Sequence, residues 1–246
     1  PSGKVSAGHL GSDPGVTAAI NGGTHMPFED VALYRTIPTA TIFEPSDLVQ
    51  LEDVMRQCPD LPGIKYIRAG RKDYPEIYAP GSHFTPGRAV VVREGKDCTV
   101  VAAGIMLHEA LKAAELLEEE GISLEVIDPV TIKPLDRKTI VESAKKTGAV
   151  VAGENHNKNG GLYDAVLEAL AEEYPVPARQ VAVEEEFGEV GPQKYLQQRF
   201  GLVKMPGNFV VDAYPVVVQV PDVLLTVAGV ALIGWLISFL TRRLTR

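Results

Sequence analysis

The residues best suited to chemistry lie in the stretch 21–30, Asn-Gly-Gly-Thr-His-Met-Pro-Phe-Glu-Asp. Gly22-Gly23 can adopt positive φ and let a ligand approach the backbone. Thr24 is expected to cap a helix whose first turn holds Pro27. The pattern therefore places His25 at the exposed N-terminal end of an amphipathic helix, within reach of a ligand. A solvated histidine beside a helix start is the competing interpretation.

Two arginines form a second candidate group. Arg68 and Arg71 follow the β-branched run Ile64-Lys65-Tyr66-Ile67, which predicts a strand. Ligands of open α/β sheets bind at the carboxyl ends of strands, and guanidinium groups suit phosphate or carboxylate. Arg71 is therefore a candidate anion-binding residue, and a solvated or ion-paired surface arginine is the alternative.

The elements that must position these groups alternate between strand and helix. The first part has a weak strand pattern over 4–10, stronger ones over 39–43 and 64–67, and helices from about Phe28 and from Ser46, which is expected to cap the latter. Prolines and glycines over 72–88 are too dense for a long element. Strand–helix–strand order implies a parallel sheet with crossover helices.

The second part repeats the alternation more clearly. It predicts strands over 97–104, 124–127, 149–152 and 181–183, and helices over 106–120, from Asp136, and over 162–170. The predicted fold class is α/β, with two three-layer α/β/α units, mainly parallel sheets and a C-terminal apolar helix. The expected divisions are 1–75, a linker 76–92, 93–202 and a tail 203–246.

Composition limits the possible classes. The 246 residues are 45% hydrophobic, enough for a core, and the net charge of −8 argues against a nucleic-acid surface. Cys58 and Cys98 lie far apart without histidines at metal-ligand spacing, so neither a disulfide framework nor a zinc site is expected. No secretory leader is visible from Pro1, and a cytoplasmic location is predicted.

The first part resembles the pyrimidine-binding domain of transketolases, which are thiamine-diphosphate enzymes. The resemblance is carried by Gly-Gly-Thr-His-Met-Pro-Phe-Glu-Asp at 22–30, Thr-Ile-Phe-Glu-Pro-Ser-Asp at 41–47 and Tyr-Ile-Arg-Ala-Gly-Arg at 66–71. In that family the Thr-His pair lines the substrate channel, and the last arginine binds the anionic end of the sugar.

The second part resembles the transketolase C-terminal domain, through residues 126–136, Glu154-Asn155-His156 and Gly160-Gly161-Leu162. In the family this domain chiefly builds the dimer. The resemblance implies that His156 is structural or interfacial, and a catalytic role is the competing interpretation.

The resemblance implies a reaction on thiamine diphosphate with magnesium, in which the cofactor's carbanion takes a two-carbon unit from a ketose. His25 would act in catalysis by hydrogen bonding to donor hydroxyls or the developing alkoxide, and Arg71 would bind the phosphate. The family's metal-binding domain and activating glutamate have no counterpart here, so no metal ligand or cofactor-binding residue is assigned. The implied partners are an N-terminal transketolase half or subunit, a second copy of the assembled enzyme, and phosphosugar substrates.

Two positions depart from the family pattern. Most relatives place a histidine twelve residues before the Thr-His histidine, where this chain has Asp13, and an aspartate where it has Asn21. Asp13 and Asn21 are therefore candidate substrate-binding residues with altered donor recognition. His9 could replace the missing histidine only if the loop carries an insertion.

The tail has a different pattern. Residues 223–240 are uncharged and mostly apolar, long enough to span a thin bilayer, and arginines follow them as the positive-inside rule expects. A buried globular helix is the alternative. Residues from 209 resemble the last membrane helix of lipoprotein-releasing ABC-type permeases, which suggests a chimera joined within 197–203. A tail-anchored enzyme is the competing view.

The sequence thus predicts the C-terminal part or a subunit of a transketolase, transferring a ketol unit between phosphosugars and incomplete without its N-terminal partner. The alternatives are a non-catalytic dimerising α/β scaffold, or a membrane-anchored permease-like chimera without transketolase activity. An oxo-acid dehydrogenase β subunit or a deoxyxylulose-phosphate synthase would share the fold. Membrane attachment through the C-terminal helix would modify the cytoplasmic location.

Overall fold

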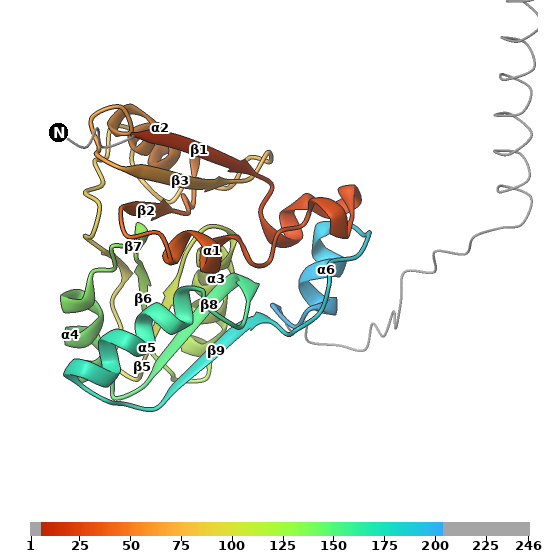
Figure 1. Ribbon diagram of the computed structural model, residues 1–246. Coiled ribbons are helices and arrows are strands. Elements are labelled where there is room, and N and C mark those ends of the chain that lie inside the picture. Colours follow the sequence, from red (N-terminus) through yellow and green to blue (C-terminus); the bar gives the residue numbers. More distant parts are fainter. Residues whose placement is uncertain (1–5, 204–246) are drawn as a thin grey trace, which may run out of the picture. The chain divides into compact units, whose positions relative to one another are not determined.

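The computed structural model describes residues 6–203, and its first sheet is four-stranded, in the order β1-β3-β2-β7 (Figure 1). The first three strands of this order are parallel, whereas β7 runs antiparallel to β2. The strands are β1 (Ala7–Ser12), β2 (Ala40–Phe43), β3 (Ile64–Ala69) and β7 (Thr131–Lys133), with helices α1 (Asp30–Arg35) and α2 (Leu48–Gln57) and the short 3₁₀ segments η1 (Gly15–Asn21) and η2 (Gly23–His25).

The second sheet has five strands in the order β4-β6-β5-β8-β9, and only β4 is antiparallel to its neighbour. Its strands are β4 (Val90–Arg93), β5 (Cys98–Ala102), β6 (Leu124–Asp128), β8 (Val150–Asn157) and β9 (Ala178–Val183). The helices of this part are α3 (Ile105–Glu119), α4 (Arg137–Thr147), α5 (Leu162–Glu173) and α6 (Gln193–Arg199).

Alternate residues of the second sheet pack in two different cores. Val100 and Val126 belong to the cluster that contains α3, whereas Val101 and Ile127 belong to the cluster that contains α4 and α5. Side chains of a strand alternate between its faces, so helices cover both faces (Figure 1). The prediction of α/β units with mainly parallel sheets is confirmed.

Two predicted helix starts were wrong. Thr24 does not cap α1, which begins only at Asp30; the Thr24 hydroxyl lies 2.9 Å from Nδ1 of His25 instead. The cap of α2 is Asp47 rather than Ser46, since Oδ1 of Asp47 accepts the Gln50 amide at 2.8 Å. Strands β4 and β7 were not predicted.

The breaker-rich segment 72–88 contains no helix or strand, as predicted, yet it is tied to the first sheet's helix α2. Oδ2 of Asp47 accepts the amides of Ile77 and Tyr78 at 2.8 and 2.9 Å. One carboxylate therefore both caps α2 and holds the segment that leads to β4. Val90, the first residue of β4, lies inside the predicted linker 76–92.

A buried arginine links elements of both sheets. Arg68 on β3 is 1% exposed, and its guanidinium contacts Asp30 of α1 at 2.7 Å and Glu44 after β2 at 2.9 Å. The same side chain donates to the Asn155 carbonyl on β8 at 3.0 Å. The Tyr66 hydroxyl donates to the Asp30 carboxylate at 2.6 Å. The arginine predicted at a strand end is thus a core residue.

The pKa values of the two carboxylates beside Arg68 shift in opposite directions. Burial raises the pKa of Glu44 more than the positive charge of Arg68 lowers it. For Asp30, burial would also raise the pKa, but the charge of Arg68 and the hydrogen bonds from Tyr66 and Arg68 lower it overall. Asp30 is therefore the ionised partner that balances the buried guanidinium.

The predicted membrane span 223–240 and the permease-like tail lie outside the described residues. Among the helices of residues 6–203, none is long and apolar enough to cross a bilayer.

We predict that Arg68→Met lowers the free energy of unfolding by about 3–5 kcal/mol, because it leaves a carboxylate buried without its counter-charge. The control Arg56→Met removes an exposed pair with Glu52 and should cost less than about 1 kcal/mol. Urea unfolding of the full chain measures both. Equal costs for the two variants would contradict this assignment, as would Arg68→Met/Asp30→Asn being no more stable than Arg68→Met.

Candidate functional site

All four residues predicted from the sequence to form the site line one pocket. His25, Arg71, Asp13 and Asn21 border a cavity of about 560 Å³. The remaining lining residues are Ser12, Gly23, Thr24, Met26, Pro27 and Glu29. The structure thus brings together the histidine and arginine segments, and the roles of these side chains remain predictions.

The loop that carries His25 depends on two glycines, for different reasons. Gly22 has φ 78°, in the left-handed region that favours glycine. Gly23 instead permits a close approach, since a Cβ there would lie 2.1 Å from the carbonyl oxygen of Gly188. Of the two glycines predicted to allow positive φ and close approach of a ligand, only Gly22 has positive φ, and the group close to Gly23 is the chain's own Gly188.

Asn155 on β8 holds the start of this loop. Its Oδ1 accepts the amide of Val16 at 2.9 Å, and its Nδ2 donates to the Pro14 carbonyl at 2.8 Å. Gly15 between them has φ 54°, and a Cβ there would lie 2.2 Å from Asn155 Oδ1. The second sheet therefore shapes a loop that serves a pocket on the first.

His25 presents a free ring nitrogen. Its Nδ1 lies 2.9 Å from the Thr24 hydroxyl, which can orient the ring. Within residues 6–203, Nε2 makes no hydrogen bond, and the side chain is exposed at the pocket. The histidine can therefore exchange a hydrogen bond or a proton with a ligand hydroxyl.

Asp13 holds Arg71 in place. Its Oδ1 accepts the Arg71 amide at 2.9 Å, and its Oδ2 pairs with the Arg71 Nε. Asp13 is buried with φ 57°, and its amide donates to the Ala69 carbonyl at 2.8 Å. Because the Arg71 side chain is 60% exposed, its terminal nitrogens remain available to an anion.

Asn21 ends η1 and contributes a neutral amide to the pocket. The charged groups around it are Arg71, Asp13 and Glu29. The pocket therefore offers one guanidinium and two carboxylates, one of which pairs with the guanidinium, together with uncharged hydrogen-bonding groups. Such a surface fits a polyhydroxylated ligand with one anionic end.

The pocket does not provide a metal site. No cluster of three or more His, Cys, Asp or Glu side chains suited to a metal ion occurs within residues 6–203.

Sequence reasoning missed Thr24 as the neighbour of the His25 ring, and Glu29 and Ser12 as pocket walls. Thr24 was assigned to helix capping, a local signal that a single sequence cannot separate from a side-chain contact. No local pattern could predict that Asn155 binds the loop at Pro14 and Val16, because these residues lie far from Asn155 in the sequence.

His156 is buried on β8 and does not line the pocket. Its Nδ1 donates to the Asn157 carbonyl at 2.7 Å, and its Nε2 accepts the Ala32 amide at 3.4 Å. Burial, with the nearby charge of Arg68, lowers its pKa to about 4. The geometry fits the predicted structural role.

Two family models match the chain. Residues 2–76 match the pyrimidine-binding domain of transketolase, and residues 87–205 match the transketolase C-terminal domain.

Among the curated relatives, 6-deoxy-6-sulfo-D-fructose transketolase subunit SqwH of Clostridium sp. (strain MSTE9) is 48% identical over 193 residues, 78% of this chain and 60% of the relative. Human transketolase is 43% identical over 176 residues, 70% of this chain and 28% of the relative. The chain thus spans less than two thirds of the first relative and less than one third of the second. Among solved structures, a split-gene transketolase described as an inactive beta4 tetramer matches with a TM-score of 0.74 and 41% identity, over 81% of this chain and 63% of that one.

We predict that Glu154→Gln changes how stability depends on pH. Burial raises the pKa of Glu154 to about 7 in the fold, against its ordinary 4.5. As pH rises from 4.5 to 7, the unfolded carboxyl loses its proton before the folded one, so this group lowers stability. The free energy of unfolding of Glu154→Gln, relative to that of the original chain, should therefore rise by up to about 3 kcal/mol across that range.

Urea unfolding at pH 5, 6, 7 and 8 measures this difference. The control is Glu120→Gln, at an exposed position. Its free energy of unfolding should differ from that of the original chain by the same amount at every pH. A constant offset for Glu154→Gln as well would contradict the prediction.

Proposed function

Because the chain carries the pyrimidine-binding and C-terminal domains of the transketolase family, we propose that it is the C-terminal subunit of a transketolase whose N-terminal half is a separate chain. The assembled enzyme transfers a two-carbon ketol unit between phosphosugars. The observation that carries this proposal is the single pocket shared by His25 and Arg71.

In this proposal Arg71 binds the anionic end of the sugar. Arg71 lines the pocket with an exposed side chain, and two parallel N–H groups of its guanidinium match two oxygens of a phosphate or sulfonate. Asp13 fixes the guanidinium through the Arg71 amide and Nε, so the cation is positioned before the substrate arrives.

His25 contacts the hydroxyls near the reacting carbon. Its free Nε2 can donate to, or accept a proton from, a hydroxyl whose charge changes during transfer. Asn21 donates an uncharged hydrogen bond on the same side. These groups bind and orient the sugar at one end of the channel.

Thiamine diphosphate and magnesium would be held mainly by the N-terminal partner. The described residues offer no cluster for the metal, whereas the pocket supplies groups for the sugar. The likeness to SqwH, called a subunit, and to a split-gene transketolase supports a two-chain enzyme. A homodimer of the assembled pair follows the family pattern, and a cytoplasmic location suits its sugar substrates.

The name of SqwH concerns a sulfonated sugar, which widens the substrate question. A sulfonate carries one negative charge, whereas a phosphate ester carries between one and two near pH 7. Asp13 beside Arg71 reduces the local positive charge and so weakens any preference for the more highly charged group. We propose that the pocket accepts both head groups.

A dimerising scaffold without a competent site is the second candidate, and its support is the C-terminal domain alone. Membrane attachment through 223–240 remains a prediction outside the described residues.

The proposal is tested by mixing the full chain with an N-terminal transketolase half, thiamine diphosphate and magnesium, and assaying ketol transfer. His25→Ala should lower kcat by about 10²-fold, the usual size of a lost proton-transfer group. Arg71→Ala should act mainly on KM for the anionic sugar, and the control Arg56→Ala should change neither. Unchanged kinetics for His25→Ala and Arg71→Ala would favour the scaffold, and no activity in any pairing would refute the proposal.

A second prediction concerns head-group choice. Asp13→Asn keeps an oxygen for the Arg71 amide but removes the negative charge. The ratio of kcat/KM for fructose 6-phosphate to that for 6-deoxy-6-sulfofructose should rise several-fold, because the dianion gains more from the added positive charge. Any loss of Arg71 positioning would weaken binding of the dianion more and lower the ratio, so a rise reports the removed negative charge. An unchanged ratio would remove Asp13 from head-group choice.

A further inference from the structure

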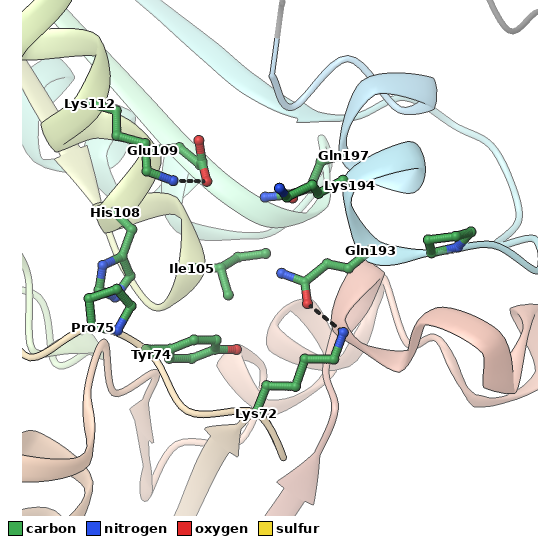
Figure 2. Close-up of a pocket in the computed structure, with 11 residues that line it drawn as sticks. Lys72, Tyr74, Pro75, Ile105, His108, Glu109, Lys112, Gln193, Lys194 and Gln197 are labelled. Carbon is green, nitrogen blue, oxygen red and sulfur yellow. Dashed lines mark hydrogen bonds and ion pairs between the residues drawn. The ribbon is translucent and has the colours of Figure 1, made fainter.

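A second cavity, of about 390 Å³, lies between three segments that are distant in sequence (Figure 2). Its walls are the chain after β3, one face of α3 and the start of α6. It shares no lining residue with the pocket of His25, although Lys72 directly follows Arg71. Cavities of this size commonly hold small ligands.

The rim of this cavity is positively charged on an acidic chain. Lys72, Lys112 and Lys194 line it against the single carboxylate of Glu109, while the whole chain has a net charge of −8. Lys112 pairs with Glu109 at 3.0 Å, and Lys72 Nζ lies 3.5 Å from Oε1 of Gln193. Lys194 makes no ion pair within residues 6–203. Clustered cations of this kind attract small anions.

Two hydrogen-bonding side chains of this cavity have no partner in the described part of the chain. Gln197 is only 6% exposed, and its side-chain amide borders the cavity without a hydrogen bond. The Tyr74 hydroxyl is likewise without one, and burial, helped by the negative charge of Glu44, raises the pKa of Tyr74. The phenol therefore stays protonated and can donate. Figure 2 shows both side chains at the cavity.

The remaining wall is apolar. Ile105 is buried at the start of α3, and the Tyr74 ring and Pro75 complete this side (Figure 2). A ligand that fits would combine an oxyanion for the lysines with a short carbon body against this wall. The side-chain amide of Gln197, which makes no hydrogen bond within residues 6–203, is free to donate to such a ligand.

We propose that this cavity is a second binding site, separate from the sugar pocket, for a small phosphate ester. Lys194 contacts the phosphate, Lys72 and Lys112 add positive charge at the rim, and Gln197 and Tyr74 donate to the ester body. The bound molecule would connect the segment after Arg71 with both α3 and α6. This site goes beyond the transketolase reaction and does not depend on it.

The test is calorimetric titration of the full 246-residue chain, without partner or cofactor, with inorganic phosphate and with glycerol 3-phosphate. We expect glycerol 3-phosphate to bind more tightly than inorganic phosphate, because only the ester reaches the apolar wall. Lys194→Glu, at an exposed position, should raise its Kd at least about tenfold. Gln197→Leu should weaken the binding of glycerol 3-phosphate more than the binding of inorganic phosphate.

Two control variants locate the binding. Lys138→Glu reverses an exposed charge on α4 and should leave Kd unchanged. Arg71→Ala removes the cation of the other pocket and should also leave it unchanged. The proposal would be overturned if the original chain did not bind glycerol 3-phosphate, or if Lys194→Glu did not weaken binding. It would also be overturned if Arg71→Ala or Lys138→Glu weakened binding as much as Lys194→Glu does. Because the chain is titrated alone, failure here would leave the transketolase assignment untouched.

Discussion

The buried ion pair between Arg68 and Asp30 is the constraint on which the pocket depends. Arg68 lies on β3, three residues before Arg71, and Asp30 begins α1, five residues after His25. Fixing these two side chains at 2.7 Å also fixes the strand end and the loop that face each other across the pocket. A buried charge pair tolerates little displacement, since separation would leave each charge desolvated.

The same arginine connects the two sheets. Its bond to the Asn155 carbonyl joins β3 to β8, while the Asn155 side chain holds the loop from Pro14 to Val16. Strand β7, from the C-terminal half of the sequence, completes the first sheet beside β2. The C-terminal domain therefore shapes the pocket of His25 and Arg71 without contributing a residue to its wall.

Local sequence pattern predicted most helices and strands, because each has a clear hydrophobic period bounded by glycine, proline or a capping residue. It missed the short helix α6 and the strands β4 and β7, which are short and pair antiparallel at sheet edges, with registers set by distant partners. The same limit applies to the site. Spacing and resemblance selected His25 and Arg71, but the pairing of Asp13 with Arg71 and the burial of Arg68 arise from contacts across the sequence.

The most direct measurement is an experimental structure of the chain assembled with an N-terminal transketolase half, thiamine diphosphate and a phosphosugar. The account predicts that the sugar's anionic group lies within hydrogen-bonding distance of the Arg71 guanidinium, with Asp13 still bound to Nε and His25 facing the hydroxyls at the other end. A sugar bound away from both side chains would contradict it.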